Sequence, residues 1–174
     1  MKLRNLPLLL AIIAGLASTV AQAATTGSLR FAGQVNAGTC NLVAGDVNRT
    51  IPLPPVKISD FAASNGVGTL DFDISADCES DIRNVTFLFT GTAAVGNGVL
   101  FANTGTSAGT ALWLLHRATS LYTIPANGSA AERSRTVATS SRKAVIPLRA
   151  GYHKNGNITQ GTLVSAVTVS ITYN

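Results

Sequence analysis

The sequence predicts an all-β sandwich with Greek-key connections. Gly, Thr, Ser, Ala, Val and Asn dominate the composition, while 12% of the residues are charged and 6% are aromatic. This mixture is poor in helix formers and rich in strand and turn residues. Apolar and polar side chains alternate with a period of two in one short segment after another, and Asn-Gly pairs mark turns at 127–128 and 155–156. A length of 174 residues suits one domain with a sizeable core.

The first residues have the organisation of a secretory signal peptide. Lys2 and Arg4 precede an apolar stretch over 6–20, and an Ala-Gln-Ala cleavage site follows at 21–23. The alternative is a transmembrane anchor, but the second half of the uncharged run is Ala, Thr, Ser and Gly rather than strongly apolar. We therefore expect an exported protein whose mature chain begins at Ala24.

The mature chain divides into short strand-like segments. Clear alternation is found over 25–35, 69–78, 84–90, 143–152 and 163–174, and shorter apolar runs over 99–101, 111–116 and 135–139. Strands at this spacing, without helical crossovers, are typical of a sandwich. Residues 49–58 are also apolar, but three prolines exclude them from the middle of a sheet, so we expect an edge strand or an extended connection there.

Two cysteines, Cys40 and Cys78, follow the signal peptide. In an oxidising compartment an isolated pair is most simply a disulfide. Its loop of about 38 residues would contribute roughly 4 kcal/mol in the chain-entropy model. A metal site would need more Cys or His residues, and a redox pair would usually have C-x-x-C spacing.

The charges are unevenly distributed along the chain. The net charge is +5, yet seven of the eight acids lie between Asp46 and Asp81, and eight basic residues follow from Arg83 onward. This polarity indicates either a solvated surface or an acidic patch on one subunit that faces a basic patch on the next. Export and the lack of an aromatic-rich basic motif argue against nucleic acid as a partner.

The segment over 25–35 resembles a strand without a partner in its own domain. It begins just after the predicted cleavage site, and its face with Gly27, Leu29, Phe31 and Gly33 would be apolar and exposed if the segment stayed free. A free strand of this kind promotes aggregation unless pairing with another chain is its function, and strand addition to another chain is a known recognition mode. The alternative is an ordinary first strand within its own domain.

Several stretches carry a family resemblance. They are the Gly-Ser-Leu-Arg-Phe-Ala-Gly-Gln-Val run over 27–35, the segment that ends at Thr39-Cys40, residues 72–78, the Ile-Pro-Leu-Arg-Ala-Gly-Tyr run over 146–152, and residues 161–173 with a Gly fourteen residues from the end and a penultimate Tyr. In this order and spacing, the chain resembles a pilin subunit of the chaperone–usher (type 1 fimbrial) family.

The resemblance implies a fold and a mechanism. Pilins of this family have an immunoglobulin-like Greek-key sandwich that lacks its last strand, which leaves a hydrophobic groove. A periplasmic chaperone lends a strand to the groove, and the N-terminal extension of the next subunit replaces it at an outer-membrane usher. The implied segments are a signal peptide over 1–23, a donor-strand extension over 24–35 and a pilin domain over 36–174.

The resemblance also implies site residues. The donor positions are Thr25, at the outermost place where exchange begins, followed by Gly27, Leu29, Phe31 and Gly33. The groove strand that the chaperone recognises carries Gly161, Leu163, Val167, Val169, Ile171 and Tyr173, and chaperone basic residues would hold the carboxylate of Asn174. Tyr173 has a second interpretation, as a core aromatic at a barrel edge. The short run before Gly27, Thr25 itself and Ser165 inside the groove strand depart from the family pattern and affect the donor register and exchange rate.

Neither an enzyme nor a cofactor or metal site is predicted. The histidines, His116 and His153, are far apart in sequence, and no nucleophile motif accompanies them. The acids over 71–81 lack the Gly and final Glu of an EF-hand loop.

The expected function is that of a structural subunit of a fimbria, which polymerises by donor-strand exchange and so supports cell adhesion. Its expected partners are neighbouring pilin subunits, a periplasmic chaperone and an outer-membrane usher, and its expected location is the cell surface. The alternative is a small secreted fimbrial binding module or adhesin, which contacts a host receptor through exposed loops such as 97–108.

Overall fold

The computed structural model describes residues 28–174. The predicted signal peptide and the donor positions Thr25 and Gly27 lie outside the described residues. The chain divides into two units, 1–35 and 36–174, and each is considered by itself. None of the helices within 28–174 is long and apolar enough to cross a membrane.

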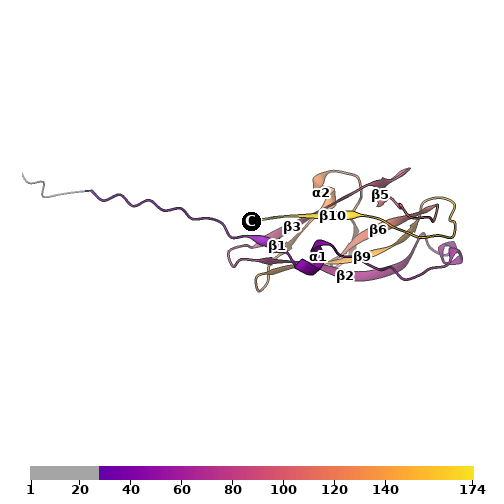
Figure 1. The fold of residues 1–174 in the computed structure, drawn as a ribbon, viewed down its shortest axis with the longest axis horizontal. Coiled ribbons are helices and arrows are strands. Elements are labelled where there is room, and N and C mark those ends of the chain that lie inside the picture. Colours follow the sequence, from indigo (N-terminus) through magenta and orange to yellow (C-terminus); the bar gives the residue numbers. More distant parts are fainter. Residues whose placement is uncertain (1–27) are drawn as a thin grey trace, which may run out of the picture. The chain divides into compact units, whose positions relative to one another are not determined.

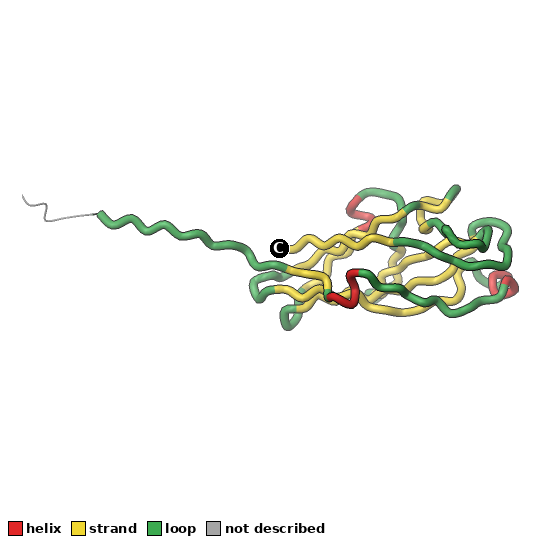
Figure 2. Tube along the Cα trace, viewed as in Figure 1, coloured by secondary structure: helices red, strands yellow, loops and turns green. Residues whose placement is uncertain are grey.

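The second unit consists of two antiparallel sheets (Figures 1 and 2). In the larger sheet the strand order is β1-β2-β9-β6-β5-β4, with β7 paired to β6, and in the smaller sheet it is β10-β3-β8. The strands are β1 (Cys40–Leu42), β2 (Gly66–Cys78), β3 (Asn84–Gly91), β4 (Ala93–Ala94), β5 (Asn97–Phe101), β6 (Thr110–Arg117), β7 (Leu121–Thr123), β8 (Ser134–Ala138), β9 (Lys143–Lys154) and β10 (Val167–Tyr173).

The core lies between the inner faces of the two sheets. In β3, Val85, Phe87 and Phe89 alternate with more accessible residues and are almost fully buried, as the period of two predicts. From the larger sheet, Ile146 and Leu148 of β9 enter the same hydrophobic cluster. The sandwich predicted from alternation is confirmed, because each of these strands buries the face that its sequence pattern marks as apolar.

Short helices connect some of the strands. They are α1 (Ala44–Val47), a 3-10 helix (Ile58–Ala62) and α2 (Ala130–Arg133). At α2, Ser129 and Glu132 form a capping box in which each side chain accepts a hydrogen bond from the other residue's backbone N–H. The backbone and side-chain hydrogen bonds from Ser129 lower the pKa of the Glu132 carboxyl. The sequence analysis did not identify this cap.

Of the two possibilities expected for residues 49–58, the extended connection is confirmed: residues 49–57 form no strand, because prolines interrupt the backbone donors that pairing requires. The Asn97-Gly98 pair lies within β5, and the turn before it contains Gly96 with φ of 76°. The receptor loop expected over 97–108 was wrong for 97–101, since this stretch is β5 and buries Leu100 and Phe101.

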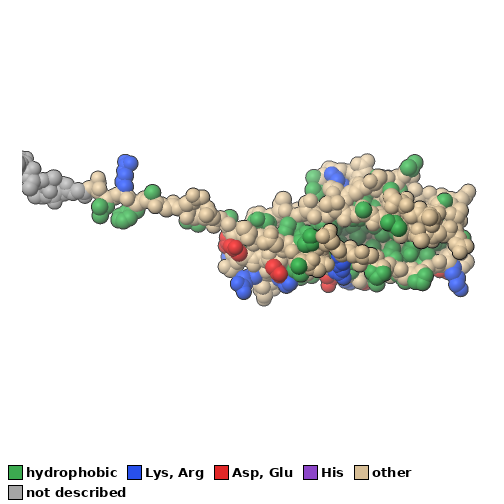
Figure 3. Space-filling view, in the orientation of Figure 1, with side chains coloured by type: hydrophobic (Ala, Val, Ile, Leu, Met, Phe, Trp, Pro, Cys, Tyr) green, Lys and Arg blue, Asp and Glu red, His purple; other side chains and the backbone are tan. Residues whose placement is uncertain are grey.

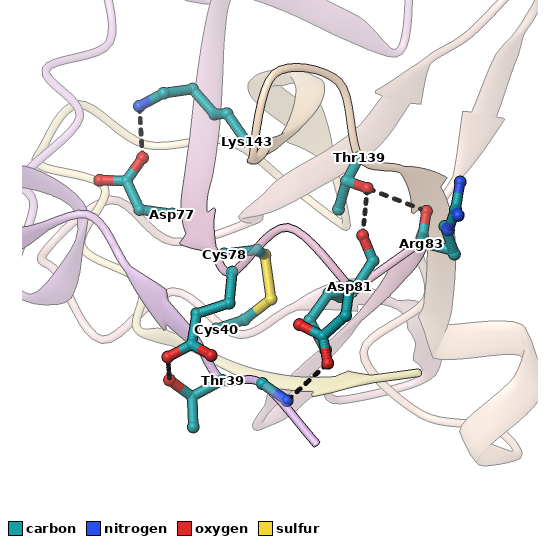
Figure 4. The surroundings of a disulfide bond; sticks show 11 residues. Thr39, Cys40, Asp77, Cys78, Asp81, Arg83, Thr139 and Lys143 are labelled. Carbon is teal, nitrogen blue, oxygen red and sulfur yellow. Dashed lines mark hydrogen bonds and ion pairs between the residues drawn. A yellow bond between two sulfur atoms is a disulfide. The ribbon is translucent and has the colours of Figure 1, made fainter. Parts of the chain in front are cut away.

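The predicted disulfide is confirmed and joins the two strands at one edge of the larger sheet. Cys40 and Cys78 are directly opposite each other in the β1–β2 pair, and both are buried (Figure 4). Polar contacts surround the bond: the backbone N–H of Gly38 donates to Asp81 at 2.8 Å, and the Thr139 hydroxyl donates to the carbonyl of Ile82. The disulfide therefore fixes the point at which the chain enters the domain.

Removal of the disulfide is expected to destabilise the domain. Replacing both Cys40 and Cys78 with Ala should lower the free energy of unfolding by about 2–5 kcal/mol, because the unfolded chain regains the entropy of the open loop. Guanidinium unfolding of the purified chain measures this change, and reduction of the unmodified chain with a thiol is the control. A change below about 1 kcal/mol in both experiments would contradict a stabilising role for the bond.

Candidate functional site: a groove beside the C-terminal strand

The C-terminal strand β10 has one free edge. Its other edge pairs with β3 in register from Val167 opposite Gly91 to Tyr173 opposite Val85. Among the described residues, no strand pairs with the remaining edge of β10. Asn174 bonds back to the β3 side through its N–H and its carbonyl. Since neighbouring residues of a strand point their peptide groups to opposite edges, the odd-numbered residues of β10 direct theirs to the free edge.

The same odd-numbered residues also face the interior. Val167, Val169 and Ile171 are partly buried and pack against the main core, whereas the even-numbered residues between them are exposed. A free edge next to an apolar face is the combination that natural sheets usually cover or protect with charge. Apart from Tyr173, the exposed side chains of this strand are Thr and Ser rather than Lys or Glu, so β10 carries no charged protection.

A groove of about 900 Å³ runs beside this edge. Hydrophobic side chains gather on the face of the domain where β10 and α1 lie (Figure 3). The groove is lined by residues 163–169 on one wall, residues 46–53 on the other, and Phe72, Ile74, Phe89, Leu112, Leu114, Leu148 and Ala150 between them. Several of these are members of the hydrophobic core or pack against it. Phe72 and Ile74 stay partly accessible, while Phe89, Leu114 and Leu148 are almost fully buried, so the groove exposes only the edge of the core along the line where a further strand would lie.

A carboxylate anchors the wall opposite β10. Asp46 accepts a hydrogen bond from the backbone N–H of Ser75 at 2.8 Å and another from Arg49 at 3.0 Å. Arg49 also donates to the carbonyl of Asp73 at 2.7 Å, and its guanidinium lies 5.9 Å from the ring centre of Phe72. Backbone pairing with β2 stops where β1 ends. Beyond that point, these contacts tie the wall to the edge of β2.

An asparagine anchors the segment that leads into β10. The Asn103 side-chain oxygen accepts from the N–H of Val164 at 2.8 Å, and its amide nitrogen donates to the carbonyl of Thr162 at 3.2 Å. The N–H of Thr104 donates to the Val164 carbonyl at 2.8 Å. This segment is thus tied to the loop after β5 on one edge. The sequence analysis missed Asn103, because its partners are about sixty residues away.

The predicted groove residues fall into three places. Val167, Val169 and Ile171 lie on β10 and face inward, while Leu163 lies before the strand, in the groove wall. Gly161 was wrongly placed on the groove strand: it is exposed, precedes β10 by six residues and packs against the backbone of 106–107. Tyr173 ends the strand with 41% of its surface exposed, so it is not the core aromatic of the alternative interpretation.

The first unit presents the expected donor side chains to solvent. Leu29, Phe31 and Val35 are 83%, 92% and 99% exposed, and residues 28–35 form neither helix nor strand. Isolated apolar residues on a surface are ordinary, but three large ones within seven residues of one extended segment favour association of this segment with another apolar surface.

The acidic stretch forms its ion pairs within the chain. Arg149 makes a two-pronged contact with Asp71 at 2.6 and 2.9 Å, and Arg117 lies 3.5 Å from the same carboxylate. The hydrogen bond from Arg149 holds the pKa of Asp71 below its usual value. Asp77 pairs with Lys143 at 2.8 Å. Of the two interpretations of the charge polarity, these pairs favour a solvated surface over a patch reserved for the next subunit.

The histidines have separate local contacts. Burial, with a smaller effect of Arg135, lowers the pKa of His116. The ring of His153 meets Trp113 edge to face with centroids 5.6 Å apart. Within residues 28–174, no group of three or more His, Cys, Asp or Glu residues is placed to hold a metal ion.

Comparison with known proteins identifies the family. A family model described as fimbrial protein matches residues 29–174. The chain belongs to the fimbrial protein family. This membership is consistent with a protein that is not an enzyme.

Curated fimbrial relatives match over different lengths. The fimbrial subunit ElfA of Escherichia coli (strain K12) is 34% identical over 89 residues, or 49% of this chain and 50% of the relative, so the alignment spans about half of each. The type-1 fimbrial protein A chain of the same strain is 26% identical and covers 99% of this chain and 100% of that one. The S-fimbrial adhesin protein SfaS of E. coli O6:K15:H31 is 30% identical over 88% of both chains.

Solved structures establish the fold. A chain from the structure of a chaperone–usher pilus aligns with a TM-score of 0.63 at 18% identity, over 86% of this fimbrial chain and 96% of that one. The P pilus rod subunit PapA aligns with a TM-score of 0.62 at 19% identity, over 78% and 99%. The predicted incomplete immunoglobulin-like sandwich is thereby confirmed as the fold.

The anchor at Asp46 can be tested by substitution. Asp46→Ala leaves the N–H of Ser75 without its carboxylate, so the free energy of unfolding should fall by about 1–3 kcal/mol. Hydrogen exchange at the Ser75 amide should accelerate as well. The matched control is Asp77→Ala. Asp77 lies on β2, the strand that carries Ser75, and its substitution removes an exposed ion pair, so the free energy of unfolding should fall by no more than about 1 kcal/mol. Equal effects of the two substitutions would show that the wall does not depend on Asp46.

Proposed function

We propose that this chain is a structural subunit of a chaperone–usher fimbria and that it polymerises by donor-strand exchange. The observation that carries the proposal is the groove beside the free edge of β10, which leaves apolar side chains at the edge of the core partly accessible along the line of a missing strand. Family membership supports the same function. In the proposed assembly, residues 24–35 of one subunit fill the groove of the next.

The groove and the proposed donor match in length and in chemistry. The wall and strand over 163–173 contain as many residues as the segment over 25–35, so an extended segment of that length covers the edge from end to end. The odd-numbered residues of β10 offer unpaired peptide groups, and an added strand satisfies them. The odd-numbered donor residues, among them Leu29 and Phe31, would point into the groove.

Burial supplies a large part of the proposed association energy. Full burial of Leu29 and Phe31 contributes on the order of 3–6 kcal/mol before entropy losses. Both side chains are exposed in the structure, and in the proposed assembly the groove of another subunit would bury them. The subunit that supplies the groove also gains, because its own stability rises when a strand occupies the groove.

The remaining partners follow from this proposal. A periplasmic chaperone would cover the groove before assembly, and an outer-membrane usher would host the exchange. The proposed segments are a signal peptide over 1–23, a donor over 24–35 and a pilin domain over 36–174, and the proposed location is a fimbria at the cell surface. Asn174 would present its carboxylate to chaperone basic residues; within the chain one oxygen of this group accepts from the N–H of Arg83 at 2.8 Å.

A second candidate function is adhesion to a host receptor. The similarity to the adhesin SfaS over 88% of both chains favours it. Assembled fimbriae of this chain, spread over immobilised glycans and matrix proteins, would test it. Saturable binding that a soluble competitor removes supports the adhesive function, and the absence of binding to every surface leaves the structural function alone.

The donor mechanism is tested by deletion of residues 24–35. After release from the chaperone, the complete mature chain should form SDS-resistant ladders, because every subunit both donates and accepts a strand. The truncated chain should remain monomeric and bind a synthetic peptide of sequence 24–35. Stable, cooperatively folded monomers in both cases would mean that the sandwich is already complete, and the proposal would fail.

The donor side chains are tested by Phe31→Ala. The substitution removes an exposed ring, so it should leave the folded domain intact and weaken strand binding about ten- to hundredfold, which corresponds to roughly 1.5–3 kcal/mol of lost burial. The matched control is Arg30→Ala, whose side chain would point away from the groove and whose effect should stay within about threefold. Calorimetry with the corresponding peptides measures both, and equal losses would exclude the predicted alternation.

A further inference from the structure

The smaller sheet has a second open edge. Its strand order β10-β3-β8 makes β8 the edge opposite β10. The N–H of Thr139, just after β8, donates to the carbonyl of Arg83, so the odd-numbered residues of this stretch direct their peptide groups to β3. Ser134, Thr136 and Ala138 direct theirs the other way, and among the described residues no strand pairs with that edge. Without protection, such an edge would also accept an added strand.

Arg135 covers this edge where β8 begins. Its guanidinium donates to the carbonyl of Ser134 at 2.6 Å and to that of Glu132 at 2.8 Å. The N–H of Ser134 donates in turn to the carbonyl of Ala131. Both peptide groups of Ser134 thus have partners within the chain, and an added strand would have to displace them.

The same guanidinium reaches the larger sheet. It donates to the carbonyl of Thr123, the last residue of β7, at 2.7 Å. Ile124 donates its N–H to the carbonyl of Leu114 in β6, so the carbonyl of the preceding Thr123 points away from β6, to the open edge of β7. Arg135 therefore ties the open edges of both sheets together, at the edge of the smaller sheet that lies opposite β10.

The charge of Arg135 is a second barrier to an added strand. The side chain is half-buried, and within residues 28–174 it forms no ion pair with a carboxylate. A strand added here would remove this charge further from water. The proposed donor segment contains Arg30 and no acid, so it would also bring a second positive charge to this edge. The residues of β10, in contrast, are all uncharged.

We propose that Arg135 confines strand addition to the groove beside β10 by closing the opposite edge of the sandwich. This inference rests on the proposed function, in which each subunit accepts one donor strand. A subunit that accepted a strand at both edges would form branched assemblies instead of a linear fibre. Arg135 thereby determines the specificity of assembly without touching the donor, because it makes the competing edge unavailable.

Peptide stoichiometry tests this closure on the full-length mature chain. The chain is refolded in an excess of a synthetic peptide with the donor sequence, and native mass spectrometry gives the ratio of chains with two bound peptides to chains with one. Arg135→Leu frees the carbonyls of Ser134 and Thr123 and should raise this ratio about tenfold, because an added strand then gains hydrogen bonds. Hydrogen exchange in the peptide-saturated variant should also slow at the amides of Thr136 and Ala138.

Arg133→Leu is the matched control, because it removes the same charge two residues earlier, where the side chain donates to the carbonyl of Gly128. Its ratio should stay within about twofold of that of the unmodified chain. Arg135→Gln is a milder second variant that can still donate to one carbonyl, so its ratio should rise about threefold. Because a chain must fold to hold a peptide in the groove, each ratio counts folded chains alone.

Two results would overturn the closure by Arg135 alone: unchanged ratios for both Arg135 variants, or an equal rise for Arg133→Leu. Stable monomers of the unmodified chain that bind no peptide would instead overturn the proposed function with it.

Discussion

The free edge of β10 and the partly accessible apolar residues beside it form the constraint on which the rest of this structure depends. The smaller sheet has the order β10-β3-β8, so the terminal strand has a neighbour on one side only among the described residues. The unpaired peptide groups and the partly buried Val167, Val169 and Ile171 belong to the same face of the same strand. One further strand would therefore satisfy hydrogen bonding and burial together.

Each wall of the groove is tied to a neighbouring element by hydrogen bonds. Asp46 binds the backbone of β2, and Asn103 binds the segment before β10. The disulfide fixes the entrance of the chain at β1. A groove with fixed walls reduces the ordering that accompanies binding, and this favours a strand that is already extended. The two walls are thus held in place before a strand binds, and the groove between them stays open.

Much of the sandwich was predictable because its strands follow local rules. Alternation located β2, β3 and β9 and assigned their inward faces, and the isolated cysteine pair predicted the disulfide. The prediction was wrong where a residue's role depends on distant partners. Gly161 seemed part of the final strand from sequence alone, but the loop at 106–107 occupies the space beside it.

The sequence by itself determined the fold class, the disulfide and the two terminal segments with strand-like patterns, because alternation and cysteine count are properties of neighbouring residues. Within residues 28–174, the tertiary structure decided that β10 has a free edge, which walls line the groove, and that the hydroxyl of Ser165 is buried there without a hydrogen-bond partner. These features depend on how segments that are distant in the sequence pair in the folded chain. The pattern of neighbouring residues does not specify that pairing.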